Sequence, residues 1–110
     1  MWVRTVALVL SCLPAVVFAD FIPLDDAEMT AALTDQALVY PDAVQTFYAS
    51  GRTLYDGGRP SWGYWRVEAG QYCSQWPRSD LWACYDMARD GFVFRFIAED
   101  GSVTDGALKN

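Results

Sequence analysis

The residues with the most distinctive chemistry are Cys73 and Cys84, which stand eleven positions apart within the aromatic-rich stretch 63–85. Such a pair could bind a metal, act as a redox-active dithiol or form a structural disulfide. Zinc needs about four ligands, and the chain contains no histidine to help supply them. A redox pair usually has the spacing Cys-x-x-Cys, which differs from the spacing here. The pattern therefore favours a disulfide, and we expect neither a metal nor another cofactor.

Residues 1–19 decide how many cysteines remain, because they have the layout of a secretory signal peptide. Arg4 supplies a positive charge, the run 6–17 is almost entirely apolar, and small or modest residues precede a cut after Ala19. A membrane-spanning helix would need about 20 apolar residues. We therefore expect cleavage, export to the periplasm or the medium, and no stable membrane insertion. A lipoprotein-type cut before Cys12 is less favoured, because it leaves a hydrophobic run shorter than the roughly 7–15 residues of a signal peptide.

Cleavage leaves Cys73 and Cys84 as the two cysteines of an exported chain, and an even number in that setting points to a disulfide. Closing a loop of this length should stabilise the fold by roughly 2–3 kcal/mol. We expect the mature residues 20–110 to form a single small β-rich domain, whose limited core would gain from a cross-link. Hydrophobic residues make up 53% of the sequence, which is enough for a folded core.

The sequence offers little for catalysis. Without histidine, neither a Ser-His nor a Cys-His nucleophile pair can form. Carboxylates could act in pairs, as in glycoside hydrolysis, but they are scattered over predicted turns and strand ends. The acidic stretch 99–106 lacks the oxygen spacing of a calcium-binding EF-hand, so we expect two ordinary turns there. We predict that the protein is not an enzyme, with a small carboxylate-dependent hydrolase as an alternative.

The acidic balance of the chain limits its partners. The net charge is −6, and removal of Arg4, the only charged residue in 1–19, makes it −7. Beyond keeping the protein in solution, this charge disfavours nucleic acid and anionic membranes as partners and favours basic ones. The expected partner is an envelope protein or a small molecule, and the oligomeric state stays open.

The residue pattern predicts a mainly β (α+β) fold, with one short N-terminal helix packed on a small antiparallel meander sheet or partial barrel. The disulfide staples this sheet. Asp25 is the candidate N-cap of the helix, and Glu28 follows at the spacing of a capping box. Residues 37–40 are expected to form a strand, which Pro41 ends.

A first hairpin is predicted after this strand. Residues 44–49 and 52–56 flank Ser50-Gly51, a dipeptide typical of turns. A turn at these two residues places Phe47 opposite Leu54.

The C-terminal aromatic residues alternate along 92–96, so Phe92, Phe94 and Phe96 are expected to share one face. A type I′ turn at Asp90-Gly91 would precede this strand. That turn pairs Met87 with Phe94, Tyr85 with Phe96, and Asp86 with Arg95.

The hairpin before Cys73 has two possible registers. A three-residue loop at 68–70 would put Trp65 on the face of Cys73, and local chemistry favours it because alanine is a poor choice for φ > 0. A two-residue turn at Ala69-Gly70 instead pairs Val67 with Tyr72. We prefer the second register, because it collects one coherent apolar face while the disulfide lies on the other. The aromatic residues assigned to this core are Trp65, Tyr72, Trp76, Tyr85, Phe94 and Phe96.

A motif now stands out in residues 63–91, made of Gly63-x-Trp65-x-Val67, Tyr72-Cys73-Ser74-x-Trp76, Cys84-Tyr85 and Asp90-Gly91. It resembles the pattern of small exported proteobacterial domains of unknown function. The resemblance implies a periplasmic, mostly antiparallel β domain, and it implies no activity.

Two shorter sequence patterns give weaker indications of a family than the motif in residues 63–91. Gly63-Tyr64-Trp65 is similar to the G-x-W of lipocalins, but it sits in the middle of the chain, so strand packing explains it better. Ser50-Gly51-Arg52 loosely resembles an inhibitory loop of periplasmic c-type lysozyme inhibitors, with the following tyrosine displaced to Tyr55. An inhibitor of a basic cell-wall-lytic enzyme is therefore one alternative function.

Three aromatic residues remain outside the predicted core. Trp62, Tyr64 and Trp82 fall near strand ends or on the polar face, where exposed aromatic residues commonly mark contact sites. The helix or a second copy of the chain could also cover them. We predict an exported, non-catalytic binding or interaction module that uses these three residues as its contact surface.

Overall fold

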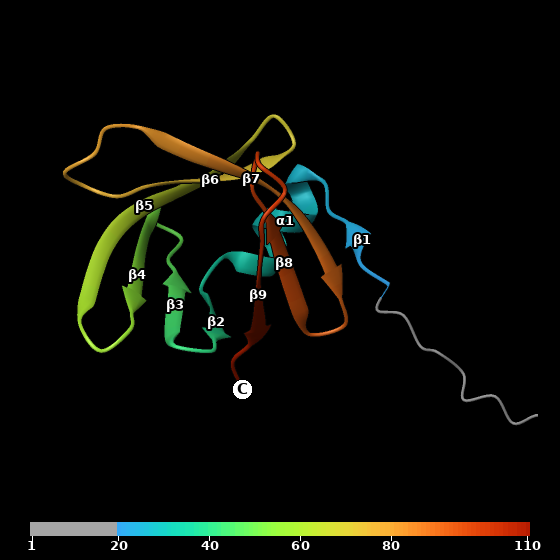
Figure 1. Cartoon of the computed structure of the whole chain (residues 1–110), viewed down its shortest axis with the longest axis horizontal. Coiled ribbons are helices and arrows are strands. Elements are labelled where there is room, and N and C mark those ends of the chain that lie inside the picture. Colours follow the sequence, from blue (N-terminus) through green and yellow to red (C-terminus); the bar gives the residue numbers. More distant parts are fainter. Residues whose placement is uncertain (1–19) are drawn as a thin grey trace, which may run out of the picture.

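The computed structural model describes residues 20–110, which form nine strands and one helix (Figure 1). The predicted signal peptide, residues 1–19, and Cys12 within it lie outside the described residues. The elements are β1 (Ile22–Pro23), α1 (Asp26–Leu33), β2 (Gln36–Tyr40), β3 (Ala43–Phe47), β4 (Arg52–Asp56), β5 (Pro60–Glu68), β6 (Gln71–Gln75), β7 (Trp82–Asp90), β8 (Val93–Ile97) and β9 (Val103–Leu108).

Strands β2 to β9 pair in chain order, and every pairing is antiparallel. The last strand then returns to the first, because β9 pairs with β2 through Leu38 and Leu108. The sheet therefore closes into an eight-stranded barrel, and the short β1 pairs with Ala88 and Arg89 of β7, beyond the residues of β7 that pair with β6. This confirms the predicted class: a mainly β fold with one short helix and an antiparallel sheet, here fully closed.

Helix α1 begins as predicted. The Asp25 carboxylate accepts a hydrogen bond from the Glu28 backbone N–H at 2.8 Å, and the Glu28 carboxylate accepts one from the Asp25 N–H at 2.9 Å. This capping box satisfies donors that the first turn would otherwise leave without partners. The helix is short, so its stability depends on burying Met29 and Leu33 in the core. Within residues 20–110, no helix is long and apolar enough to cross a membrane.

Helix α1 closes one end of the barrel. Near its N-terminus, the Asp26 carboxylate accepts a hydrogen bond from the Gly70 N–H in the β5–β6 turn at 2.7 Å. Just beyond its C-terminus, the Asp35 carboxylate accepts one from the Ala49 N–H in the β3–β4 turn at 3.0 Å. Met29 and Leu33 belong to the same buried cluster as Leu38, Phe47, Trp65 and Phe94, and the helix contacts β2 and β5.

The predicted register of the β3–β4 hairpin is wrong by one residue. Phe47 lies opposite Thr53, not opposite Leu54. The backbone of Tyr48 bonds to Arg52, so the turn has three residues, the last of which, Gly51, has φ 92°. A three-residue turn that ends in a left-handed glycine is a common hairpin connection, and it directs Phe47 and Thr53 into the barrel.

The β5–β6 hairpin has the two-residue turn predicted from the consistency of the apolar face. Val67 pairs with Tyr72 and Arg66 with Cys73, while Cys73 pairs with Cys84 on β7. The Cys73–Cys84 disulfide is present as predicted and lies on the outer side of the barrel wall. The turn itself holds Ala69 at φ 52° and Gly70 at φ 81°.

Ala69 therefore destabilises the turn locally, because its left-handed conformation is strained for alanine. A substitution at this position can relieve the strain. Asparagine tolerates this conformation better and is preferred in two-residue turns. We expect Ala69→Asn to raise the free energy of unfolding by about 0.5–1 kcal/mol, which chemical denaturation would measure. Ala69→Val should do the opposite, because a β-branched residue fits positive φ poorly. Equal stability of the two variants would contradict the assigned turn.

The β7–β8 register differs from the prediction by two residues. Asp90 pairs with Val93, so the turn consists of Gly91 and Phe92, with positive φ at Gly91 as in type II′ turns. Met87 consequently lies opposite Phe96 instead of Phe94. A two-residue shift keeps every side chain on its original face, so the apolar pattern could not detect it.

Two consequences follow for side chains near this turn. Phe92, predicted to share one strand face with Phe94 and Phe96, lies in the turn and is 73% exposed. Arg95 does not pair with Asp86; its guanidinium donates two hydrogen bonds to the Asp105 carboxylate on β9, at 2.8 and 2.9 Å. The prediction considered only β7 and β8 and therefore chose Asp86 as the partner of Arg95. The actual partner, Asp105, comes from β9, which pairs with the other edge of β8.

The predicted core aromatic residues all point into the barrel, but to different depths. Trp65, Tyr72, Phe94 and Phe96 are buried, whereas Trp76 and Tyr85 are only partly buried. The Trp65 ring stacks on Tyr72 and meets Phe47 edge-on, on the side of the wall away from the disulfide. Trp76 and Tyr85 belong to a different feature, at the end of the barrel opposite α1.

Candidate functional site

A cavity of about 480 Å³ lies in the end of the barrel that α1 does not close. The β2–β3, β4–β5, β6–β7 and β8–β9 connections all meet at this end, because alternate turns of an up-and-down barrel share one rim. We call this cavity the mouth pocket. Its lining residues are Tyr40, Pro41, Asp42, Gln45, Tyr55, Ser61, Tyr72, Ser74, Trp76, Tyr85, Phe96 and Thr104.

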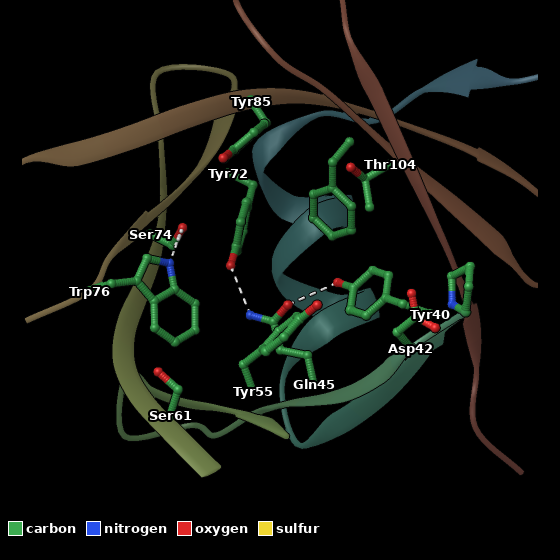
Figure 2. A pocket seen from close by; sticks show the side chains of 12 residues that line it. Tyr40, Asp42, Gln45, Tyr55, Ser61, Tyr72, Ser74, Trp76, Tyr85 and Thr104 are labelled. Carbon is green, nitrogen blue, oxygen red and sulfur yellow. Dashed lines mark hydrogen bonds between the residues drawn. The ribbon is translucent and has the colours of Figure 1, made fainter. Parts of the chain in front are cut away.

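The lining combines aromatic rings with uncharged polar groups. It contains six aromatic side chains, four of them tyrosines, together with one amide and three aliphatic hydroxyl groups. Asp42, at the exposed β2–β3 turn, is the only charged residue of the lining. Figure 2 shows the side chains around an open centre, with Trp76 and Ser61 on one side and Tyr40 and Asp42 on the other.

The floor of the pocket is organised by the buried amide of Gln45 on β3. Its carbonyl accepts a hydrogen bond from the Tyr40 hydroxyl at 2.9 Å. Its NH₂ donates to the hydroxyls of Thr53 at 2.9 Å and Tyr72 at 3.3 Å (Figure 2 draws the bonds to the two tyrosines). A buried polar network with its bonds made fixes the side chains that it joins, so the rings of Tyr40 and Tyr72 are held in place.

Two glycines make room for aromatic rings of the pocket wall. A Cβ atom at Gly63 would stand 2.5 Å from the Trp76 ring, and one at Gly106 would stand 2.7 Å from the Tyr40 ring. Both distances are far inside van der Waals contact. Gly63 therefore lets Trp76 fold over β5 after β6 has ended, which gives the glycine of the Gly63-x-Trp65 motif a structural reason.

Nearer the opening, the wall of the pocket carries hydroxyl groups that could form hydrogen bonds with a ligand. The Trp76 indole N–H is already bonded, since it donates to the Ser74 hydroxyl at 3.2 Å. By contrast, four hydroxyl groups of the lining make no hydrogen bond to any part of residues 20–110; they belong to Tyr55, Ser61, Tyr85 and Thr104. The pocket thus offers aromatic surfaces and neutral hydrogen-bonding groups together.

Burial changes the acidity of the two tyrosines of the floor. Desolvation raises the pKa of Tyr72 to about 12, although its hydrogen bond with Gln45 acts in the opposite direction. Desolvation is also the main cause that raises the pKa of Tyr40 above its ordinary value. Both phenols therefore remain neutral hydroxyl groups over the physiological pH range.

These pKa shifts predict a loss of stability in alkali. An unfolded tyrosine releases its proton near pH 10, whereas folded Tyr72 retains it to about pH 12. The unfolded state then binds fewer protons, so the free energy of unfolding falls as the pH rises through this window. Denaturation curves at a series of pH values should show the fall, and Tyr72→Phe should make it shallower. An unchanged slope in Tyr72→Phe would contradict the assignment.

The contact surface predicted from the sequence lies elsewhere, on the outside of the barrel. Trp62 and Tyr64 of β5 are 46% and 42% exposed, and Trp82 of β7 is partly exposed. The structure brings the three to one outer face, because Tyr64 pairs with Gln75 and Gln75 with Trp82. We call these three residues the outer aromatic row.

The outer aromatic row is already engaged by arginines of the same sheet. The Arg52 guanidinium lies 4.7 Å from the Trp62 ring centre and 5.5 Å from that of Tyr64, and the Arg66 guanidinium lies 3.8 Å from that of Trp82. Such cation–π contacts stabilise a strand surface by themselves. The row therefore has a structural explanation, and its role as a contact surface remains a prediction.

Sequence reasoning missed most of the mouth pocket. It assigned Tyr72, Trp76, Tyr85 and Phe96 to a core, it did not single out Gln45, and it considered Tyr55 only as part of a lysozyme-inhibitor-like loop. One signal could have found Gln45: it is a polar residue at a position that alternates with inward-facing Ala43 and Phe47. In residues 20–110, no group of three or more acidic or cysteine side chains is arranged to hold a metal ion.

No family model, curated protein or solved structure matches the chain.

Proposed function

We propose that the protein is an exported, periplasmic binding module, not an enzyme, and that it takes a small molecule into the mouth pocket. The observation that carries the proposal is a preformed cavity of about 480 Å³ whose aromatic and neutral polar walls are held by the Gln45 network. Ligand sites are typically concave, largely apolar and preformed, with volumes of about 300–1,000 Å³ and a few fixed polar groups. The predicted signal peptide and the disulfide support an oxidising compartment outside the cytoplasm.

The composition of the pocket supports binding over catalysis. Asp42 is the only carboxylate of the lining, so the pocket does not provide the second carboxylate that paired acid–base hydrolysis would use. Tyr40 and Tyr72 are shifted away from the acidity that a general acid near neutral pH needs. The hydrolase alternative therefore has less support than a binding role.

The inhibitor alternative concerns the opposite end of the barrel. Ser50-Gly51-Arg52 lies in and beside the β3–β4 turn, next to a shallow surface groove that also includes Trp62. The groove is lined by one positive side chain, Arg52, and one negative side chain, Asp35, so it has no net negative charge that would attract a basic partner, even though the chain is acidic overall. We therefore place the binding site in the mouth pocket and treat inhibition of a basic cell-wall-lytic enzyme as the weaker alternative.

The experiment that tests this function is ligand capture from an envelope extract. The mature protein would be incubated with the extract and purified again, and retained proteins and small molecules would be identified by mass spectrometry. We expect a retained small molecule that is lost in Tyr55→Leu and kept in Tyr64→Leu. These two tyrosines are matched, since they are 37% and 42% exposed on neighbouring strands but face opposite sides of the wall.

Other outcomes would contradict the proposal. Loss of the ligand in Tyr64→Leu but not in Tyr55→Leu would move the site to the outer aromatic row. A stoichiometric protein partner, retained equally by Tyr55→Leu, would favour an interaction or inhibitor module. Turnover of a substrate by the purified protein would restore the enzyme class.

A further inference from the structure

The mouth pocket has a strong bias in charge. Its lining contains no lysine or arginine, and its one charged group, the Asp42 carboxylate, stands at the rim. The arginines of the strands are engaged elsewhere: Arg52 and Arg66 lie over the outer aromatic row, Arg89 contacts the Phe94 ring and the Gly91 carbonyl, and Arg95 is paired with Asp105. Arg59 and Arg78 lie in the β4–β5 and β6–β7 connections and do not line the pocket. An anionic ligand would leave water without a positive partner in this pocket, which costs free energy.

Three aromatic rings of the wall, those of Tyr40, Tyr55 and Trp76, lie next to one another. The Tyr55 ring lies 6.0 Å from the Tyr40 ring and 6.2 Å from the Trp76 ring, to which it is nearly perpendicular. A cation within about 6 Å of a ring centre is attracted by the ring's quadrupole, most strongly by tryptophan. Rings this close to one another let a single cation contact more than one of them, and Figure 2 shows Trp76, Tyr55 and Tyr40 along one arc of the opening.

From this arrangement we infer that the mouth pocket binds a small organic cation of the alkylammonium class. The cationic group rests against Trp76, Tyr55 and Tyr40, with Asp42 at the entrance as its carboxylate partner. The free hydroxyls of Ser61, Tyr85 and Thr104 receive polar groups on the rest of the ligand. This inference rests on the proposed function and adds to it the chemical class of the ligand. The net charge of −6 favours the approach of such a ligand to the protein.

The test uses choline as the probe and isothermal titration calorimetry as the measurement. The comparison ligand is the neutral isostere of choline, in which a tert-butyl group replaces the trimethylammonium group. Shape and apolar area are then nearly constant while the charge is removed. We expect choline to bind about tenfold or more tightly than the isostere, because cation–π attraction is lost with the charge. Binding of choline should weaken as salt is added, since salt screens the Asp42 carboxylate.

Variants locate the effect within the pocket. Trp76→Leu should weaken choline binding by about tenfold or more. Asp42→Asn should weaken it by about two- to fivefold and flatten its salt dependence, because an exposed ion pair contributes little. Tyr64→Leu, on the outer aromatic row, should bind choline like the original protein. If Trp76→Leu does not fold, Tyr55→Leu serves instead, since Tyr55 is more exposed.

The outcomes separate the ligand class from the proposed function. Equal binding of choline and its neutral isostere would overturn the cation inference, as would undetectable binding of choline together with Tyr55-dependent capture of a neutral or anionic molecule from the extract. In both cases the pocket would still be a binding site. If no molecule, choline included, depends on Tyr55 or Trp76, the proposed function fails as well.

Discussion

Replacing Trp65 by alanine is expected to lower the free energy of unfolding by about 3–5 kcal/mol, as truncation of a large core residue does. The indole is 8% exposed and packs between Phe47 and Tyr72. Its N–H also donates to the Tyr48 carbonyl oxygen at 2.9 Å. Truncation would therefore leave a cavity beside α1 and remove one of the two hydrogen bonds that the Tyr48 carbonyl accepts, the other coming from the Gly51 N–H. Urea denaturation followed by circular dichroism measures the loss.

Trp62→Ala is the matched control, since Trp62 lies on the same strand but faces outward. It stacks on Tyr48 and is covered by Arg52, yet it is 46% exposed. We expect a cost of about 1 kcal/mol or less, in keeping with exposed cation–π and surface contacts. A cost for Trp65→Ala as small as that for Trp62→Ala would show that the two faces of β5 have been assigned wrongly.

The second large effect is expected from the disulfide. The double replacement Cys73→Ala and Cys84→Ala should lower the free energy of unfolding by roughly 2–3 kcal/mol, because the unfolded chain regains the entropy of an open loop. The two cysteines are directly opposite each other on β6 and β7, and Cys73 is fully buried. Double replacement avoids the unpaired buried thiol that a single change would leave.

Thiol titration of the native, oxidised protein provides the control for this measurement. It should find no reactive thiol until a reductant is added. The double variant should keep the far-ultraviolet spectrum of the folded barrel at moderate temperature, because six of the eight barrel strands lie outside the β6–β7 pair. Complete loss of that spectrum at low temperature would mean that the disulfide is required for folding and does not merely stabilise the fold.

Local and pairwise chemistry predicted much of the fold from the sequence. The capping box of α1 needs only Asp25 and Glu28 at the right spacing. The disulfide could be predicted because cleavage of the signal peptide leaves two cysteines in a chain that we expect to be exported. The β5–β6 register needed one more step, because the positive φ of Ala69 opposed it locally while the shared apolar face of β5, β6 and β7 favoured it. In that case consistency over three strands outweighed one strained turn residue.

The registers that sequence reasoning missed depended on turn details that side-chain patterns do not specify. Ser50-Gly51 was compatible with turns of two or three residues, and only the longer one turns Phe47 inward opposite Thr53. At Asp90-Gly91, a shift of two residues leaves every face unchanged, so Phe92 could be placed in the strand or in the turn. Arg95 found its acidic partner on β9, a strand that the prediction had not defined.

The mouth pocket could not be predicted because it depends on closure of the barrel. Tyr40 and Thr104 come from strands near opposite ends of the chain, and they approach one another because β2 pairs with β9. Before closure, Trp76 and Tyr85 look like ordinary core residues on an apolar face. The space that separates them from the deeper core exists only because α1 fills one end of the barrel and leaves the other open.

The central claim is that the open end of the barrel, and not its outer aromatic row, is the binding site. Residues 20–110 contain four tryptophans in distinct places: Trp76 in the pocket, Trp65 in the core, and Trp62 and Trp82 on the outer row. Nitrogen-15 NMR of the indole N–H groups reports on each one separately. On addition of choline, or of the small-molecule fraction of an envelope extract, we expect the Trp76 signal to shift while those of Trp62 and Trp82 stay nearly unchanged. Shifts confined to Trp62 and Trp82, with Trp76 unmoved, would contradict it.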